Sequence, residues 1–365
     1  MKVLIQGAGI AGLSLAAELR LLGIEHRIVE RATELKPIGA GITLSVNALG
    51  CLAKFLDLDD LRLRGVSLER MYLSDAGGVV LSEVPARLTK DQSPGLALKR
   101  GELHAALARA IHPTSLRLGT SIAKIERRTA FLSNGEDFSF DLLVGADGIR
   151  SEVRTRFLKS TTPLRYSGYT CWRGLVHHLP VPSQVTEAWG AGCRLGTVPV
   201  SANETYVYAT LNAQAGEGRG LRAEDILPHF HDFVDRDYLR AIFEEGHIIQ
   251  SDIEELPAPI WGEDTIVLIG DAAHAMTPNL GQGAAMGIED AAFLARTLAM
   301  GHTDFAQALR EERGPRVRWV ANQSRRIGRA GQLRHPFVRW SRDRLLRLTP
   351  ASVMEGNLRR MLTTS

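Results

Sequence analysis

A glycine-rich turn near the N-terminus restricts what this chain can fold into. The pattern predicts a strand at residues 2–6 (KVLIQ), a tight turn at 7–12 (GAGIAG), a helix at 13–23 that stops at a glycine, and a second strand at 26–29. The order strand, GxGxxG, helix and strand is typical of a dinucleotide-binding βαβ unit. The sequence therefore predicts a Rossmann-like α/β domain at this end of the chain.

Each glycine of this turn has a physical task. Gly7 permits the turn, Gly9 lets a pyrophosphate approach the backbone, and Gly12 lets the helix pack closely on the strand. The helix N-terminus, which includes Ala11, offers free N–H groups and a partial positive charge to phosphates. Glu30 ends the second strand, where a carboxylate can accept hydrogen bonds from both ribose hydroxyls and disfavours a ribose phosphate. These residues indicate a nucleotide of the NAD or FAD kind.

Two further motifs lie far along the chain. Residues 141–151 (DLLVGADGIRS) predict a strand, a turn and a helix start. Residues 265–291 place a Gly-Asp pair after an apolar run, followed by a proline, a GQG loop and a predicted helix. A plain dehydrogenase would continue in regular strand–helix alternation, whereas a GAG stretch at residues 39–41 interrupts it here. The pattern favours FAD over NAD as the bound nucleotide.

Taken together, GAGIAG from Gly7, GADGIRSEVR from Gly145 and GDAAHAMTP from Gly270 resemble the three motifs of the FAD-dependent class A aromatic hydroxylases, typified by para-hydroxybenzoate hydroxylase. The resemblance spans residues 1 to about 332. It implies an α/β fold: a Rossmann-like FAD domain with an inserted, mostly antiparallel β-sheet substrate domain and a C-terminal helical segment. The implied ranges are 1–161 and 257–301 for the FAD domain, with 71–96 contributing to the substrate side, 162–256 for the substrate domain, and 302–365 for the helical segment.

The resemblance also implies cofactor contacts. Asp271 would bond the ribityl chain of FAD, and Pro278 would lie beside the reactive edge of the flavin. The following loop would present bare N–H groups at a helix start, where they suit the negative charge of a reduced flavin. The loop residues expected to contact the cofactor are Gly281, Gln282, Gly283, Ala284 and Ala285. Further contacts are expected from Arg31, Thr43, Arg100, Ile122 and Asp147, although Arg100 could instead form a surface salt bridge.

The substrate side is expected between residues 162 and 256, where several runs alternate in polarity. In the run ETYVYATLN, Tyr206, Tyr208 and Thr210 fall on one face of a predicted strand. These side chains, together with Arg173 and Arg194, are candidates for the substrate chamber, or are ordinary sheet residues that face solvent. The candidate catalytic set is Pro278, Arg194 and Tyr206; no general base is assigned. His274 is interpreted as a packing or hydrogen-bonding residue.

The resemblance implies a reaction as well. NADH or NADPH would reduce the flavin transiently, because no second GxGxxG follows a predicted strand. The reduced flavin would react with O2 to a C4a-hydroperoxide, which hydroxylates an electron-rich aromatic or N-heteroaromatic ring. A flavin-dependent reductase, a halogenase and a flavoprotein without turnover remain alternatives. The halogenase motif WxWxIP is absent, since Trp172 is followed by Arg-Gly-Leu.

Two substrate classes follow from the resemblance. Flavin-dependent urate hydroxylases have an acid in the loop position of Asn279, paired with an arginine that aligns with Arg194. The sequence is more similar to that of bacterial 2-alkyl-4-quinolone 3-monooxygenases, in the segments VLIQGAGIAG, PIGAGITL, LKRGELHAAL, TCWRG and AMTPNLGQGAAM. An alkylquinolone is the preferred small aromatic substrate, its alkyl tail requires an apolar tunnel, and a urate- or salicylate-type hydroxylase is the alternative.

Positive charge is concentrated near the C-terminus. Residues 310–360 contain 14 arginines, no lysine and 4 acids, whereas the whole chain has a net charge of +3. This segment is either a helical layer whose arginines face water or pair with the body, or a contact with a membrane surface. Nothing in the sequence resembles a nucleic-acid module. The start MKVLIQGAG lacks the features of a signal peptide, and the three cysteines form no CxxC pair. The chain is therefore expected to be cytoplasmic, with reduced thiols, or additionally membrane-associated.

Overall fold

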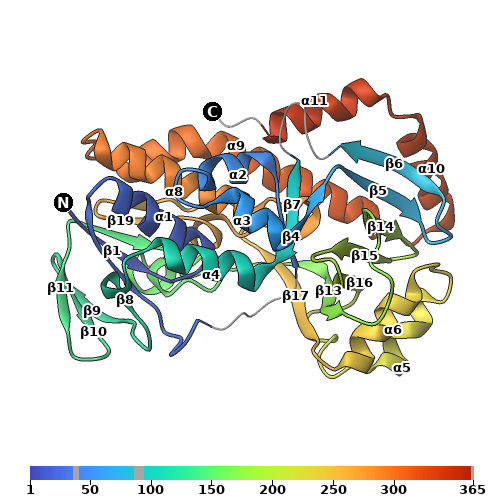
Figure 1. The fold of residues 1–365 in the computed structure, drawn as a ribbon, viewed down its shortest axis with the longest axis horizontal. Coiled ribbons are helices and arrows are strands. Elements are labelled where there is room, and N and C mark those ends of the chain that lie inside the picture. Colours follow the sequence, from blue (N-terminus) through green and yellow to red (C-terminus); the bar gives the residue numbers. More distant parts are fainter. Residues whose placement is uncertain (36–40, 86–93, 363–365) are drawn as a thin grey trace.

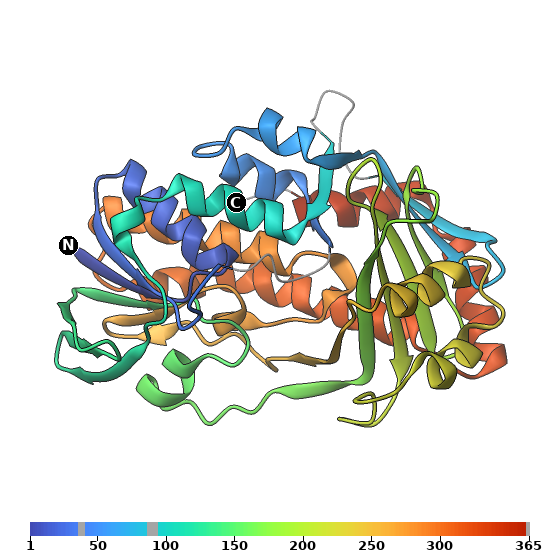
Figure 2. The same ribbon diagram turned by 60° about the horizontal axis from the view of Figure 1, so that its bottom comes forward.

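The structure is a computed structural model that describes residues 1–35, 41–85 and 94–362 (Figure 1). Two large sheets dominate it. A six-stranded sheet and its helices form one half of the molecule, and a seven-stranded sheet forms the other (Figures 1 and 2). The long helix α9 (Phe305–Gly331) extends from the first half to the second.

The six-stranded sheet has the order β18-β19-β12-β1-β2-β8. Its strands are β1 (Lys2–Gln6), β2 (Glu25–Val29), β8 (Leu116–Arg117), β12 (Leu142–Gly145), β18 (Gly262–Glu263) and β19 (Ile266–Leu268). All neighbours are parallel except β18 and β19. In the register, Gln6 pairs with both Val29 and Gly145. The turns that follow these strands therefore meet at one edge of the sheet.

The central strands of this sheet are uniformly apolar because they lie inside the main hydrophobic core, between a layer of helices and other packed elements. The helices are α1 (Ile10–Leu21), α4 (Arg100–Ala110), α8 (Gly283–Ala299) and α9. Val3, Leu4 and Ile5 of β1 are completely buried. Helix α8 lies against α1, because a Cβ atom on Gly287 would be only 3.1 Å from Cβ of Ala11.

The seven-stranded sheet has the order β17-β13-β16-β15-β14-β5-β6. Its strands are β5 (Arg70–Asp75), β6 (Val80–Pro85), β13 (Arg165–Val176), β14 (Val185–Trp189), β15 (Cys193–Pro199), β16 (Thr205–Asn212) and β17 (Ile249–Glu255). Only the pair β14–β5 is parallel. One face packs against α5 (Ala223–Ile226) and α6 (Arg236–Glu245) around Trp172 and Phe230. The opposite face is turned toward the six-stranded half (Figure 2).

Smaller elements complete the chain. One three-stranded sheet contains β3 (Gly41–Leu44), β7 (Gly95–Lys99) and β4 (Gly65–Leu68), and another contains β9 (Ile122–Glu126), β10 (Thr129–Leu132) and β11 (Asp137–Ser139). The short helices are α2 (Val46–Leu52), α3 (Leu58–Leu63), η1 (Pro113–Ser115), η2 (Val153–Phe157), η3 (Leu227–Phe230), α7 (Asp271–His274) and η4 (Pro278–Leu280). The chain closes with α10 (Pro336–Leu348) and α11 (Ala351–Leu362).

The predicted fold class is confirmed. The parallel sheet with its flanking helices, the mostly antiparallel second sheet and the helical C-terminal segment are all present. No helix among the described residues is long and apolar enough to cross a bilayer.

Buried charges fasten α9 to α8. The guanidinium of Arg313 lies 2.6 Å from Glu289 and 2.9 Å from Asp290, and all three side chains are almost fully buried. Arg316 also binds Glu289, at 2.8 Å, and donates to the backbone carbonyls of residues 360 and 361 in α11. These pairs hold α9 and α11 against the six-stranded half.

Replacing Arg313 by Ala should destabilise the fold by about 3–5 kcal/mol, because the buried carboxylates of Glu289 and Asp290 would each lose a guanidinium partner. Chemical denaturation followed by circular dichroism measures this change. Arg318 lies exposed on the same helix, so Arg318→Ala is the matched control and should change stability by less than about 0.5 kcal/mol. Equal effects of the two substitutions would contradict the role given to Arg313.

Candidate functional site

The glycine turn after β1 leaves a backbone cradle at the edge of the parallel sheet. Gly7 has a φ of 108°, and a Cβ atom there would lie 2.4 Å from the carbonyl oxygen of Ala146. A Cβ atom on Gly12 would lie 2.0 Å from the carbonyl oxygen of Gly7. In contrast, a Cβ atom on Gly9 would meet nothing within 4 Å. Packing thus requires glycine at Gly7 and Gly12, whereas Gly9 faces open space.

Helix α1 points its positive end into that space. It begins directly after Gly9, has no side-chain cap, and carries no acidic residue in its first turn. Its first N–H groups, including that of Ala11, are therefore available to an anion, and the helix dipole favours one. A phosphate group fits this position.

Glu30 is fixed beside the same turn. One carboxylate oxygen accepts a hydrogen bond from the N–H of Ala8 at 2.8 Å, and the other accepts from the N–H of Ala32 at 2.9 Å. The side chain is half-buried, and each oxygen retains a lone pair for a hydroxyl donor. This geometry fits a ribose diol. Arg31, the next residue, is exposed.

The two carboxylate oxygens of Asp147 differ in their hydrogen bonding. Its Oδ2 accepts from the N–H groups of Glu152 and Val153, at 2.7 and 3.1 Å, and so caps η2. Its Oδ1 is buried and has no hydrogen-bond partner. A buried acceptor without a partner is costly in an isolated protein, so this atom is suited to a donor on a bound ligand.

The carboxylate of Asp290, which is buried, fixes the Gly-Asp turn that follows β19. Asp290 of α8 accepts from the N–H of Gly270 at 3.1 Å, from Nε2 of His274 at 2.5 Å and from Nε of Arg313 at 2.9 Å. Burial alone would raise the pKa of Asp290, but His274 and Arg313 hold it at about 2. Asp290 is therefore an anion that fixes the turn, and His274 serves this network. Asp271 itself is exposed at the open edge.

The loop of residues 278–285 lies opposite Asp271. Gly281 has a φ of 62°, and a Cβ atom there would be 2.8 Å from Oγ1 of Thr43. A Cβ atom on Gly283 would be 3.9 Å from a carboxylate oxygen of Asp271. Residues from three separate segments, at Thr43, at Asp271 and at 281–283, thus lie next to one another.

Helix α8 begins at this loop without a side-chain cap and without an acid in its first turn. The N–H groups of Gly283, Ala284 and Ala285 are accordingly free for a negatively charged partner. The side chain of Gln282 is buried, and its amide donates to Ser45 at 2.9 Å. Gln282 can therefore contribute only its backbone to the site.

Ile122 and Arg100 are two further residues that the sequence predicts to contact the cofactor. Ile122 starts β9 and is completely buried in the core, so only its backbone can face a ligand. Arg100 begins α4 and is exposed, within electrostatic range of Tyr206. The remaining predicted cofactor contacts border the open edge or the α8 loop, and the whole set fits an extended dinucleotide.

The second half of the site is the polar face of the seven-stranded sheet. One row across the strands joins Glu187, Gly196, Tyr208 and Arg173, and the next joins Trp189, Arg194, Thr210 and Cys171. Side chains in register on alternate positions share a face of the sheet. Tyr206, Tyr208 and Thr210 therefore project from the same side, as the alternation in the sequence predicts.

Arg194 lies in a closed network on this face. Its Nη1 is 3.2 Å from Glu187, its Nε donates to Thr210 at 3.2 Å, and its guanidinium lies 5.2 Å from the ring centre of Tyr169. A Cβ atom on Gly331 would be 2.5 Å from Cδ of Arg194, so the end of α9 covers it. The side chain is only 1% exposed.

The two tyrosines depend on glycines opposite them. The ring of Tyr208 crosses Gly196, where a Cβ atom would be 2.1 Å from Cζ, and its hydroxyl donates to Glu187. Burial, with the charge of Glu187, raises the pKa of Tyr208 well above its ordinary value. The ring of Tyr206 lies across the backbone of Gly41, 2.7 Å from a Cβ atom placed there. Burial raises the pKa of Tyr206 as well, so both phenols remain neutral donors.

Asn279 links the loop before α8 to strand β13 and to helix α9 by hydrogen bonds. Its Oδ1 accepts from the hydroxyl of Tyr169 at 3.2 Å, and its Nδ2 donates to the carbonyl of Ser324 in α9 at 2.8 Å. The adjacent Pro278 is exposed at the start of η4. The loop that carries Pro278 is therefore tied to the polar face through Tyr169.

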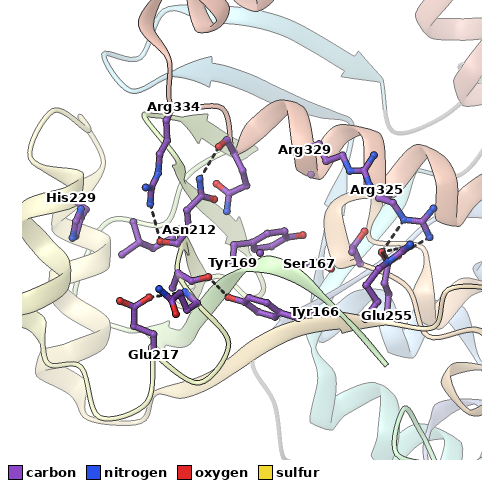
Figure 3. A pocket seen from close by; sticks show the side chains of 18 of the residues that line it. Tyr166, Ser167, Tyr169, Asn212, Glu217, His229, Glu255, Arg325, Arg329 and Arg334 are labelled. Atoms are coloured by element: carbon purple, nitrogen blue, oxygen red, sulfur yellow. Dashed lines mark hydrogen bonds and ion pairs between the residues drawn. The ribbon is translucent and has the colours of Figure 1, made fainter. Parts of the chain in front are cut away.

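A cavity of about 860 Å³ opens beside this junction, between β13, the end of β16 and α9 (Figure 3). Arg334 and His229 lie on one side of it, and Arg325 and Arg329 on the other. Its lining combines charged side chains, such as Arg325 and Glu255, with apolar ones, such as Leu211 and Leu221. It borders the polar face through Tyr169.

The sequence did not single out three residues of this site. Asp290 binds His274, Glu187 binds Arg194, and Arg313 binds Asp290. A Glu-Asp pair within an otherwise apolar helix was the available signal for Asp290. No local pattern distinguishes Glu187 or Arg313 from ordinary surface charges.

Comparison with known proteins agrees with this arrangement. A family model described as an FAD binding domain matches residues 1–316. The chain is 42% identical over 362 residues to 2-heptyl-3-hydroxy-4(1H)-quinolone synthase of Pseudomonas aeruginosa, covering 96% of this chain and 94% of that protein. It is 34% identical to aurachin C monooxygenase/isomerase of Stigmatella aurantiaca, covering 99% and 98%. The crystal structure of Klebsiella pneumoniae HpxO with FAD and uric acid matches with a TM-score of 0.85 at 27% identity, covering 99% and 96%.

Replacing Asp271 by Ala should remove most of the bound FAD, because its exposed carboxylate is predicted to bond the ribityl chain of the cofactor. The ratio of flavin absorbance to protein in the purified enzyme measures it, with at least a tenfold loss of affinity expected, roughly the 1.4 kcal/mol of one charged hydrogen bond. Glu263→Ala, an exposed acid of nearby β18, is the control. A fully flavinated Asp271→Ala protein would refute the assignment.

Proposed function

The chain belongs to the family of proteins built on the FAD binding domain, and from this premise we propose that it is a single-component FAD-dependent monooxygenase. It inserts one oxygen atom from O2 into an electron-rich aromatic or N-heteroaromatic ring, with NADH or NADPH as the reductant. The main support for the proposal is that two surfaces of the candidate site lie next to each other. The free N–H groups of α8 and Asp271 lie on one side, and the polar face with Tyr206 and Tyr208 lies on the other.

The protein's own residues bind, orient and stabilise charge. Bound FAD supplies the oxygen-activating chemistry. The turn at Gly7–Gly12 and the start of α1 would hold the phosphates, and Glu30 would hold the adenosine ribose. The start of α8 would stabilise the negative charge that the cofactor gains on reduction. Pro278 would sit beside the ring of the cofactor.

We propose a 2-alkyl-4-quinolone, or a closely related ring, as the substrate. The 42% identity to an enzyme named for a 2-heptyl-3-hydroxy-4-quinolone product supports this class. The 34% identity to an aurachin C monooxygenase/isomerase supports it too. A urate hydroxylase is the alternative, supported by a relative at 30% identity. The ring carbon next to the carbonyl of a quinolone is nucleophilic, as an electrophilic oxygen donor requires.

The purified holoenzyme should oxidise NADH or NADPH faster when the correct ring is present, and mass spectrometry should find that ring heavier by one oxygen atom. The panel is an alkylquinolone, urate, salicylate and a simple phenol. Addition of oxygen to the alkylquinolone alone is the expected result. Oxygen added to urate instead would favour the alternative, and hydrogen peroxide with no oxygenated ring in any case would contradict the proposed activity.

We further propose that α10 rests on an anionic membrane surface, which would hold an apolar substrate. Its exposed side carries Phe337, Trp340, Leu345 and Leu348. The rings of Phe337 and Trp340 stack at 5.9 Å, and Arg344 lies 5.5 Å from the Trp340 ring. Exposed apolar side chains beside arginines are typical of helices that lie in the interface of a bilayer. The excess of arginine in residues 310–360 favours anionic lipid.

The triple substitution Phe337→Ser, Trp340→Ser and Leu348→Ser should weaken co-sedimentation with phosphatidylglycerol vesicles roughly tenfold or more, because it removes the apolar side chains available to the bilayer. Leu63→Ser is the control, since Leu63 is 88% exposed on α3. Unchanged co-sedimentation of the triple variant would exclude α10 as the contact.

A further inference from the structure

We propose that Glu187 is a specificity-determining residue that makes the substrate wall electrically neutral. Its carboxylate pairs with Arg194, so the site accepts an uncharged ring and discriminates against a ring that carries a carboxylate. The inference rests on the proposed function in one respect, namely that the polar face of the seven-stranded sheet is the wall of the substrate site.

Three donors converge on Glu187. Oε1 accepts from Nε1 of Trp189 at 2.6 Å and from Nη1 of Arg194 at 3.2 Å, and Oε2 accepts from the hydroxyl of Tyr208. The row Glu187–Gly196–Tyr208 makes this contact possible, since the Tyr208 ring crosses β15 only where no Cβ atom stands. The carboxylate is therefore held in one position on β14.

The other neighbours of Arg194 are uncharged. They are Thr210, the Tyr169 ring and the backbone at Gly331. Among the described residues, Glu187 is the one carboxylate within ion-pair distance of Arg194. The pair thus carries no net charge, although one of its members is a guanidinium that would otherwise attract an anion.

The nearby loop adds no carboxylate and no free charge. Asn279 is neutral, and its amide is occupied by Tyr169 and Ser324. Arg173, the second guanidinium on this face, is directed to Ser251 of β17 and to Tyr206. It lies on β13, which β16 separates from β15 and Arg194.

A substrate carboxylate placed against this face would find the guanidinium of Arg194 buried and already paired. It would also approach the carboxylate of Glu187, and like charges repel strongly where water is excluded. The desolvation of the incoming anion would have no compensating pair. A carbonyl or ring N–H does not carry this penalty, because it can hydrogen-bond to a neutral tyrosine hydroxyl.

Salicylate and salicylamide are the probes for this inference, since they share a ring and a hydroxyl and differ in charge. Their dissociation constants for the holoenzyme can be measured through the change in flavin absorbance. The wild-type protein should prefer salicylamide. In Glu187→Gln the relative affinity for salicylate should rise about tenfold or more, because Arg194 would lack its partner. Glu187→Asp keeps the charge and should keep the wild-type preference.

Glu204, in the half of the molecule that contains the seven-stranded sheet, provides a matched control. Glu204 is buried and pairs with Lys99 at 3.0 Å and His177 at 3.1 Å, away from Arg194. Glu204→Gln removes a buried carboxylate without uncovering Arg194, and its preference should equal that of the wild type. A Glu187→Gln protein that retains FAD and shows the wild-type ratio overturns the proposal.

If Glu187→Gln does not retain FAD, Arg194→Gln provides the second measurement. It leaves Glu187 without its cation, so salicylate should bind still more weakly relative to salicylamide; an unchanged ratio overturns the proposal. These ratios need neither NAD(P)H nor turnover. Failure to hydroxylate any ring would therefore count against the proposed function alone, while an active hydroxylase with unchanged ratios would count against Glu187 alone.

Discussion

The carboxylate of Asp290 is the contact on which the rest of this structure depends. It sits completely buried at the point where the turn before Asp271, the helix α8 and the helix α9 meet. Because it accepts from Gly270, His274 and Arg313 at once, the position of the Gly-Asp turn is coupled to that of α9. A buried anion without these donors would be strongly unfavourable, so the arrangement forms as a unit.

Helix α9 carries this constraint into the second half of the molecule. One end is fixed by Arg313, the middle meets Asn279 through Ser324, and the other end covers Arg194 at Gly331. The nucleotide-binding edge and the polar sheet face are therefore positioned by the same rigid element. A site between two sheets needs such a link, since each sheet has its own hydrophobic core.

Close backbone approach recurs on both sides of the site. Gly7 and Gly12 let the first turn pack on the β12 end, while Gly41 and Gly196 make room for the rings of Tyr206 and Tyr208. In every case a Cβ atom would overlap a neighbouring atom. The glycines opposite the polar sheet face thus make room for aromatic side chains, whereas the turn at the nucleotide edge exposes N–H groups.

The sequence by itself determined the dinucleotide turn after the first strand, because that turn depends on neighbouring residues, and it indicated the FAD family, because three motifs occur in a set order along the chain. It also located the loop at residues 278–285 and the alternation that puts Tyr206, Tyr208 and Thr210 on one face. The roles assigned to individual site residues remain predictions. Only the tertiary structure decided the partners: Asp290 for His274, Glu187 for Arg194, and α9 as the cover. Strand register and helix docking set these pairs, and both result from packing between segments distant in sequence, which no local pattern records.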